Sequence, residues 1–114
     1  MKHNTTTEKI DLLQGTLDML VLKSLARTSL HGYEVAKWIR EASDDALQVE
    51  EGSLYPALYR MEHRGWIKSA WGTSDNNRKA RYYSLTGKGR QQLRVESSSW
   101  SKLSDAISKI MQTA

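Results

Sequence analysis

The 114-residue sequence has no cysteine, a single proline and no long apolar run, and each of these narrows the possible protein classes. Without cysteine the chain has no disulfide scaffold, no cysteine-ligated zinc finger and no thiol nucleophile. The longest apolar run, Met19–Leu22, is far shorter than the roughly 20 residues of a membrane span. The start of the chain, Met1–Thr5, lacks the apolar stretch of a signal peptide. We therefore expect a soluble, cytoplasmic protein with no membrane partner.

Signatures of catalysis and metal binding are missing as well. The sequence has no P-loop, no nucleophile elbow, no HExxH motif and no pair of carboxylates placed around an apolar pocket. Its three histidines are scattered and have no cysteine beside them, so we expect no metal site. The sequence accordingly predicts a protein that is not an enzyme and that needs no cofactor.

The distribution of charge is more informative than its total. The length of 114 residues predicts a single domain. For a chain of this size a net charge of +4 is modest. Between Arg60 and Arg94, however, there are nine lysines and arginines and only two acids, whereas residues 41–51 carry five acids and no base. A positive segment beside a negative one is typical of a protein that binds a polyanion such as nucleic acid. Ordinary solvated surface is the alternative explanation.

The hydrophobic spacing predicts helices over residues 11–26, 33–42 and 53–64. The first is apolar on more than one side, so part of its cover could come from a partner subunit. The second has one buried face, formed by Val35, Trp38, Ile39 and Ala42. In the third, Gly52 or Ser53 can act as the N-cap, Pro56 is tolerated in the first turn, and Gly65 can end the helix in the left-handed conformation.

A hairpin and a last helix follow. Residues 66–71 and 81–85 read as strands, joined by the turn-rich and basic segment 72–80. Thr86 can cap a helix that continues to Met111. Along it, apolar side chains recur with heptad spacing, which is typical of a helix that packs on another helix. With the first helix, these positions predict a homodimer interface made of Leu13, Leu17, Leu93, Trp100, Leu103, Ile107 and Ile110.

Three helices followed by a basic hairpin are the outline of a winged helix-turn-helix. The fold class is therefore mainly α with a small β-hairpin: a flexible N-terminus over 1–9, a DNA-binding domain over 10–86 and a C-terminal dimerisation helix over 87–114. The third helix would enter the major groove of double-stranded DNA, and the hairpin would be the wing. We expect the DNA-binding side chains to be Ser53, Tyr55, Pro56, Tyr59, Arg60 and His63 of the third helix, Tyr33 and Lys37 of the second, and Arg78, Lys79 and Arg81 of the wing.

Five sequence blocks resemble the short-form PadR-family transcriptional regulators. The blocks are LQGTL at 13–17, HGYEV at 31–35, EGSLYPALYRME at 51–62, GWI at 65–67 and RYYSLTGKG at 81–89. The resemblance implies a dimeric bacterial repressor that binds a palindromic operator near its own or a neighbouring promoter. It also implies a role in detoxification or efflux and a small aromatic or amphipathic effector. The recognition-helix role falls on Ser53, Tyr55, Pro56 and Tyr59, and the wing role on Arg78, Lys79 and Arg81.

Two departures from the family pattern matter. Wing tips in the family often carry glycine and proline, whereas this chain has Asn76, Asn77 and Ala80, which puts the wing contacts in more doubt than the helix contacts. Longer members have a large C-terminal helical domain, whereas this chain has one helix. We therefore expect an effector site at the dimer interface, where Trp100 and its symmetry mate could stack on a flat aromatic molecule.

Alternatives remain open at several positions. Tyr55 and Tyr59 could pack on the start of the second helix, His63 could be solvated, and Trp100 could be an ordinary packed interface residue. His31 is expected in a turn or on a phosphate, Trp38 and Trp71 in the core, and Trp66 in the core or an interface. For the whole chain, the alternative is a winged helix that binds another protein instead of DNA. Whether the regulator represses or activates is also left open.

Overall fold

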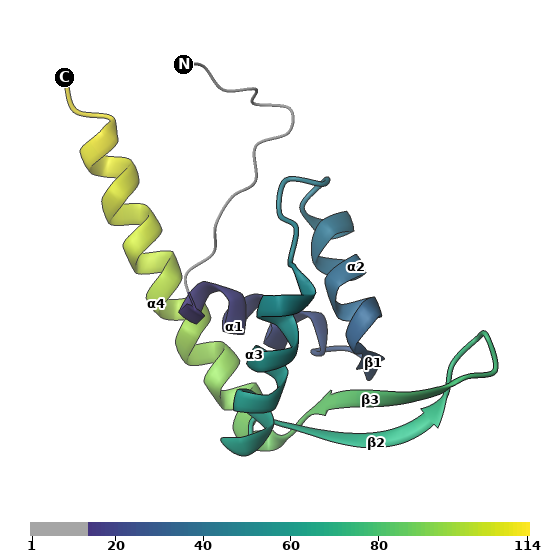
Figure 1. Ribbon diagram of the computed structural model, residues 1–114. Coiled ribbons are helices and arrows are strands. Elements are labelled where there is room, and N and C mark those ends of the chain that lie inside the picture. Colours follow the sequence, from purple (N-terminus) through teal and green to yellow (C-terminus); the bar gives the residue numbers. More distant parts are fainter. Residues whose placement is uncertain (1–13) are drawn as a thin grey trace.

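The structure, a computed structural model, describes residues 14–114 (Figure 1). In these residues, three helices precede a hairpin and a long last helix follows it. The helices are α1 (Gln14–Ser24), α2 (Gly32–Ala42), α3 (Glu51–His63) and α4 (Gly87–Met111), and the strands are β1 (Leu30–His31), β2 (Ile67–Thr73) and β3 (Lys79–Leu85). The predicted class, mainly helical with a small antiparallel sheet, is confirmed. The predicted N-terminal segment 1–9 and the start of the first helix at Asp11 lie outside the described residues.

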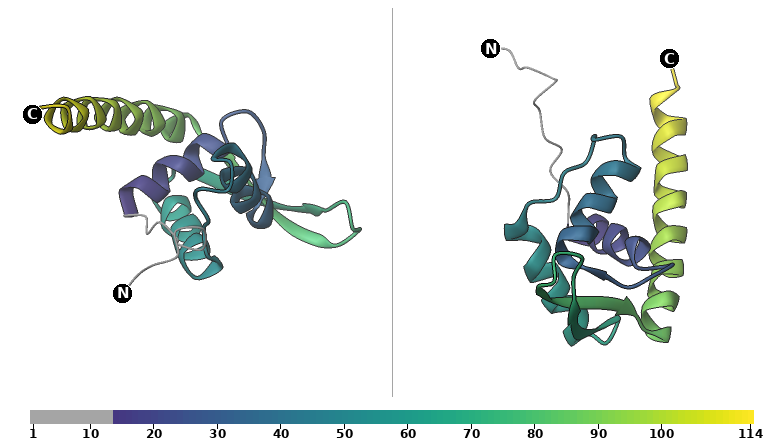
Figure 2. Two further views of the ribbon diagram at one scale, coloured as in Figure 1. Left: turned by 90° about the horizontal axis from the view of Figure 1, so that it is seen from above. Right: turned by 90° about the vertical axis from the view of Figure 1, so that its right-hand side faces the viewer.

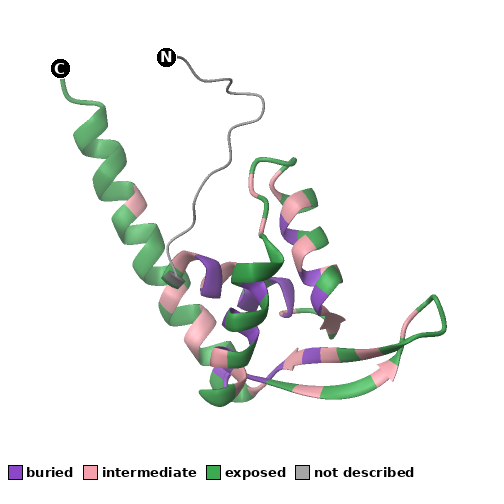
Figure 3. Ribbon diagram, in the orientation of Figure 1, coloured by how far each residue is buried: buried purple, intermediate pink, exposed green. Residues whose placement is uncertain are grey.

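The core lies where α1, α2 and α3 meet the base of the sheet (Figure 3). Val35 and Ile39 of α2 and Leu54, Leu58 and Met61 of α3 are fully or almost fully buried there, as their helical spacing predicts. Two tryptophans predicted in the core are not in it, because Trp38 is 37% and Trp71 is 64% exposed. Ala42, which was predicted on the buried face of α2, is exposed as well. Trp66 is buried and belongs to the core.

The start of α2 is fixed by a reciprocal cap that the sequence analysis missed. The Glu34 backbone N–H donates to His31 Nδ1 at 3.3 Å, and the His31 backbone N–H donates to Glu34 Oε1 at 3.1 Å. This capping box satisfies two backbone donors at the helix start. Residues 28–32, predicted only as a break between helices, also contain β1.

The three strands form one antiparallel sheet in the order β1-β3-β2. Leu30 pairs with Tyr83, and β2 pairs with β3 from Ile67–Leu85 to Thr73–Lys79. Tyr83 and Leu85 point into the core, while Tyr82 and Ser84 lie on the other face, as predicted from the alternation. Both strands reach further toward the tip than predicted, so the turn shrinks to residues 74–78.

The limits of α3 differ from the prediction at its start. The helix begins at Glu51 after Glu50, which makes no side-chain capping bond, whereas Gly52 or Ser53 was predicted as the cap. Pro56 therefore lies in the second turn and withholds one backbone donor there. At the other end, Gly65 has a φ of 80°, the left-handed conformation predicted for it.

The last helix, α4, begins at Thr86 and leaves the body of the protein. The Thr86 hydroxyl accepts a bond from the Gly89 backbone N–H at 3.0 Å, which confirms the predicted cap. Twenty-five helical residues span about 37 Å at about 1.5 Å per residue. The first half packs beside α1, whereas the second half extends beyond the rest of the described chain in all views (Figure 2).

Gly89 provides a test of this junction. A Cβ atom at Gly89 would overlap the Trp66 carbonyl oxygen, whereas a Cβ at Gly87 would meet nothing within 4 Å. We expect Gly89→Ala to lower the free energy of unfolding by about 2 kcal/mol or more, because backbone cannot move aside cheaply. Gly87→Ala, two residues away, should be neutral or stabilise by up to about 1 kcal/mol. Urea unfolding of both variants measures this, and equal effects would contradict the packing described.

Candidate nucleic-acid interface

The outer face of α3 is polar, aromatic and open to solvent. Five predicted contact residues of this helix are exposed: Ser53, Tyr55, Pro56, Tyr59 and His63. Tyr59 is the most open of its aromatics, with 73% of its surface exposed, and its ring lies 6.3 Å from that of His63. The structure thus turns one face of α3 into the core and leaves hydroxyl, imidazole and ring edges on the other, as a helix that reads base edges requires.

A hollow of about 550 Å³ joins α2, α3 and the hairpin. It gathers predicted residues from three separate segments. These are Tyr33 and Lys37 of α2, Tyr55 of α3, and Arg78, Lys79 and Arg81 of the hairpin. Two acids, Glu34 and Asp75, line it as well, and Glu34 is engaged in the cap of α2. A neighbouring hollow of about 420 Å³ adds Tyr59 and His63 to the same side of the molecule.

Tyr55 bridges the two predicted helices of this surface. Its ring covers Gly32, where a Cβ atom would come within 2.7 Å of the Tyr55 hydroxyl. The side chain nonetheless remains 45% exposed. The packing that was weighed as an alternative to DNA contact is therefore present, and it leaves part of the ring open toward the hollow.

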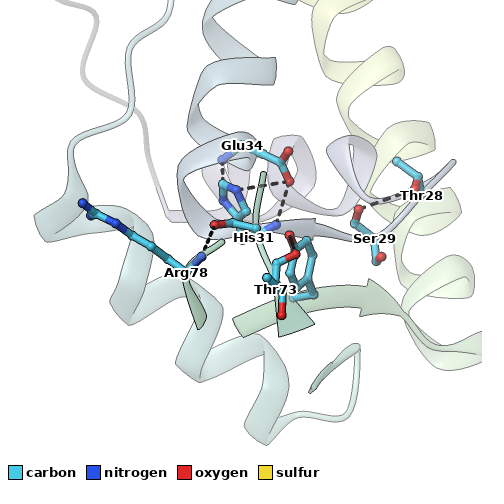
Figure 4. Close-up of polar contacts among 8 residues, drawn as sticks. Thr28, Ser29, His31, Glu34, Thr73 and Arg78 are labelled. Carbon is cyan, nitrogen blue, oxygen red and sulfur yellow. Dashed lines mark hydrogen bonds and ion pairs between the residues drawn. The ribbon is translucent and has the colours of Figure 1, made fainter. Parts of the chain in front are cut away.

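The tip of the wing presents two cations that have no acidic partner within residues 14–114. Arg78 and Lys79 are exposed, and the Arg78 side chain points away from the neighbouring contacts (Figure 4). The turn that carries them is held by its own backbone, since the Ser74 N–H donates to the Arg78 carbonyl at 2.8 Å. Asn77 takes the left-handed conformation there, with a φ of 59°, which asparagine tolerates. Asn77 thus takes the left-handed backbone conformation that glycine takes in many turns.

Arg81 differs from its two neighbours because its side chain is engaged. Its Nε donates to the Ser69 hydroxyl at 2.9 Å, and Ser69 in turn donates to Glu62 at 2.6 Å. The guanidinium also lies 3.7 Å from Glu62 and stacks over Trp71 at 5.6 Å. Sequence reasoning missed this cluster, because its members become neighbours only through the pairing of β2 with β3 and the packing of α3 beside β2.

Arg60 faces α1, away from the predicted DNA-binding surface. Its guanidinium forms an ion pair with Asp18, which is almost fully buried. Burial raises the pKa of Asp18, and the hydrogen bond and charge of Arg60 oppose that rise. The helical period placed Arg60 at the edge of the outer face without showing this partner, and its role as a DNA contact stays an untested prediction.

The predicted dimer residues fall into three groups. Leu13 lies outside the described residues. Leu17 is 6% exposed and Leu93 is partly buried against the same core, so both pack within the chain, and their assignment to a dimer interface stays a prediction. The remaining four form an exposed apolar row on α4: Trp100, Leu103, Ile107 and Ile110.

Trp100 also borders a hollow of about 250 Å³ between α1 and α4. Met19 and Leu103 contribute apolar walls, and Glu96 contributes a carboxylate. The described part of the chain contains no group of three histidine, aspartate or glutamate side chains placed to hold a metal ion. None of its helices combines the length and apolar character of a membrane span.

Comparison with known proteins identifies relatives for this arrangement. The PadR-like family of transcriptional regulators matches residues 21–95. A PadR family transcriptional regulator from Eggerthella lenta is 32% identical, with a TM-score of 0.73 over 89% of this chain and 86% of that chain. A PadR-like transcriptional regulator from Bacillus cereus is 29% identical, with a TM-score of 0.77 over 90% and 97%. A transcriptional regulator from Clostridium thermocellum is 30% identical, with a TM-score of 0.76 over 84% and 93%.

Removal of the Arg60 side chain tests its structural role. We expect Arg60→Met to lower the free energy of unfolding by about 3 kcal/mol near neutral pH, because Asp18 would keep a buried charge without a cation. Lys68→Met, which removes an exposed cation, should change it little.

The deficit of Arg60→Met should also depend on pH. The variant raises the already elevated pKa of Asp18 further, and only the ionised carboxylate is penalised in the folded state. The deficit should be complete above this raised pKa and shrink as the pH falls toward 3.8, the ordinary value. Urea unfolding over that range measures it. A deficit that stays constant with pH would rule out the buried pair as its cause.

Proposed function

The chain belongs to the PadR-like family of transcriptional regulators, and we propose that it acts as a homodimeric repressor that binds a palindromic operator. The observation that carries the proposal is the exposed outer face of α3 beside a wing with unpaired cations. In this proposal, residues 10–86 form the DNA-binding domain and residues 87–114 the dimerisation helix. The target is its own or a neighbouring promoter, of the detoxification or efflux type.

The proposed division of labour follows the chemistry of each residue. The exposed side chains of α3 face base edges in the major groove, where hydroxyls, rings and imidazole can discriminate between bases. These side chains are Ser53, Tyr55, Pro56, Tyr59 and His63. Tyr33 and Lys37 of α2 contact the sugar-phosphate backbone of the DNA next to these bases. Arg78 and Lys79 contact phosphate or the minor groove at the wing, because no acid of residues 14–114 compensates their charges.

The proposed dimer rests on the exposed row of α4. Trp100, Leu103, Ile107 and Ile110 are each about half or more exposed in the single chain. A contiguous apolar row of this kind marks an interaction surface, and a projecting helix of so few turns gains most of its stability from packing. A second copy of α4 related by a two-fold axis would cover the row and give the protein the symmetry of a palindrome.

An aromatic effector is proposed at the same interface. Trp100 is 50% exposed at the hollow that Met19 and Leu103 also line. A planar molecule could stack on the indole there, and Glu96 would favour a cationic one. Such a ligand would alter DNA affinity to the extent that it prefers one arrangement of the dimer over another.

Substitutions should separate backbone contacts from base contacts. We expect Arg78→Ala with Lys79→Ala to weaken binding to a selected operator and to random DNA alike, because phosphate contacts carry no sequence information. The slope of log K against log salt should fall by about 0.9 for each phosphate that is no longer neutralised. Tyr59→Ala and Ser53→Ala should instead reduce the preference for the operator. Fluorescence anisotropy over a salt series measures both.

The assignment would be overturned if the wing variant lost sequence preference alone. A chain that binds no duplex would favour a winged helix that binds another protein.

A charged residue in the exposed apolar row of α4 should dissociate the proposed dimer. Light scattering of the wild type at micromolar concentration should give twice the 13.0 kDa mass of one chain. Ile107→Glu should give a monomer, because a carboxylate would be buried without a partner. Ser98→Glu, on the opposite side of the helix, is the matched control and should remain dimeric. A wild-type protein that is already monomeric contradicts the proposal.

Tryptophan fluorescence tests the effector site. Planar cationic dyes should quench the wild type more strongly than anionic phenolic acids, because Glu96 lines the site. Trp100→Phe should lose most of this response because the stacking partner is gone. Trp71→Phe, which removes another exposed indole, should keep it. Binding that survives unchanged in Trp100→Phe would eliminate the stacking site, and no binding across the panel would leave Trp100 as a packed interface residue.

A further inference from the structure

The cluster around Arg81 lies where the wing leaves the body of the protein. Ser69 pairs with Tyr83 in the hairpin, and Trp71 pairs with Arg81 two residues further toward the tip. Tyr83 is buried, whereas Trp71 and Arg81 are exposed. The cluster therefore marks the place where packing against the core ends and the hairpin continues into solvent (Figure 1).

Three contacts from two elements, β2 and α3, hold the Arg81 side chain. Ser69 of β2 accepts from its Nε at 2.9 Å, Glu62 of α3 lies 3.7 Å from its terminal nitrogen, and Trp71 of β2 lies under its planar face at 5.6 Å. Ser69 also donates to Glu62 at 2.6 Å, which closes a ring of polar contacts. A single ion pair at a surface is weak, but several contacts on one rigid guanidinium fix its position.

We propose that Arg81 is a positioning residue that ties the wing to the recognition helix α3 through Ser69 and Glu62, and not a residue that binds phosphate. The inference rests on the proposed DNA-binding function and assigns Arg81 a different part in it. The tether sets the angle between α3 and the tip that carries Arg78 and Lys79. Both elements can then meet the duplex in one fixed register.

The tether also neutralises the negative charge of Glu62. Glu62 is the acid on the flank of α3 and borders the hollow shared with Tyr55 and Tyr59. An uncompensated carboxylate at that place would repel the phosphate backbone. Because Arg81 neutralises Glu62, the pair contributes no net charge to DNA binding, and the salt dependence should come from Arg78, Lys79 and Lys37.

The test compares wild type with Arg81→Gln, Glu62→Ala and the double variant, with Arg78→Gln as a control that removes an unpaired arginine from the same hairpin. The first measurement needs no DNA. Hydrogen exchange of the amides of residues 72–80 should accelerate in both single variants. The double variant should exchange no faster than either single one, because one change already opens the tether. Amides of α1 report that the fold is intact.

The second measurement is binding to a duplex that the wild type has selected from a random pool, over a salt series. Arg81→Gln should weaken operator binding about tenfold. The double variant, which removes both charges of the pair, should leave the salt slope unchanged, whereas Arg78→Gln should lower the slope by about 0.9 per phosphate contact. Glu62→Ala should steepen the slope on random DNA, because Arg81 becomes free to meet phosphate. The double variant should lack that gain.

A fall in slope for the double variant equal to that of Arg78→Gln would overturn the proposal, as would operator losses that simply multiply in the double variant. A protein that binds no duplex at all would refute the proposed function instead. In that case the exchange data alone decide the tether: unchanged exchange in both single variants refutes it, and equal, non-additive acceleration supports it.

Discussion

The carbonyl group of Trp66 is the point on which the arrangement of the molecule depends. It accepts a backbone bond from the Thr86 N–H at 3.1 Å. The Thr86 hydroxyl lies 2.6 Å from the adjacent Gly65 carbonyl, to which it donates, and 3.1 Å from the Trp66 carbonyl. The same hydroxyl caps α4, and Gly89 in the first turn of α4 lies so close to this carbonyl that no side chain would fit. The end of α3, the open end of the hairpin and the start of α4 are thereby joined through a few atoms. The contacts of Trp66 with Thr86 and Gly89, which come directly after α3 in the structure, therefore also set the direction of α4.

The basic residues divide into those that hold the fold and those that face outward without a partner. Arg60 is paired with Asp18, Arg81 with Glu62, and Arg90 donates to the Ala26 carbonyl at 3.1 Å. Arg64 lies over the ring of Trp66 at 5.1 Å. The total of basic side chains therefore overstates the charge offered to DNA. Around the hollow that Tyr55 borders, the cations that no acid of residues 14–114 contacts are Lys37, Arg78 and Lys79.

The sequence predicted the elements well because each has a local cause. Leu54, Leu58 and Met61 recur with the helical period, Gly65 can take a positive φ, and Thr86 precedes a helix start. The errors and omissions come from contacts between distant segments. Trp71 is apolar in a strand pattern, but it lies beyond the end of the core. Arg60 lies at the edge of an outer face, but Asp18 approaches it from another helix. Neither the two-residue strand β1 nor the Arg81 cluster leaves a periodic signal.

The proposed role of the protein is most directly tested by the geometry of the DNA site that it prefers. Two copies of α3 held by one α4 interface should read two half-sites related by a two-fold axis. Selection from a random duplex pool, followed by sequencing, gives that geometry even when the natural promoter has not been identified. The recovered sites should be inverted repeats whose half-site centres lie about one helical turn, about 10 base pairs, apart. Recovery of direct repeats, of single unrepeated sites or of no common sequence would contradict the account.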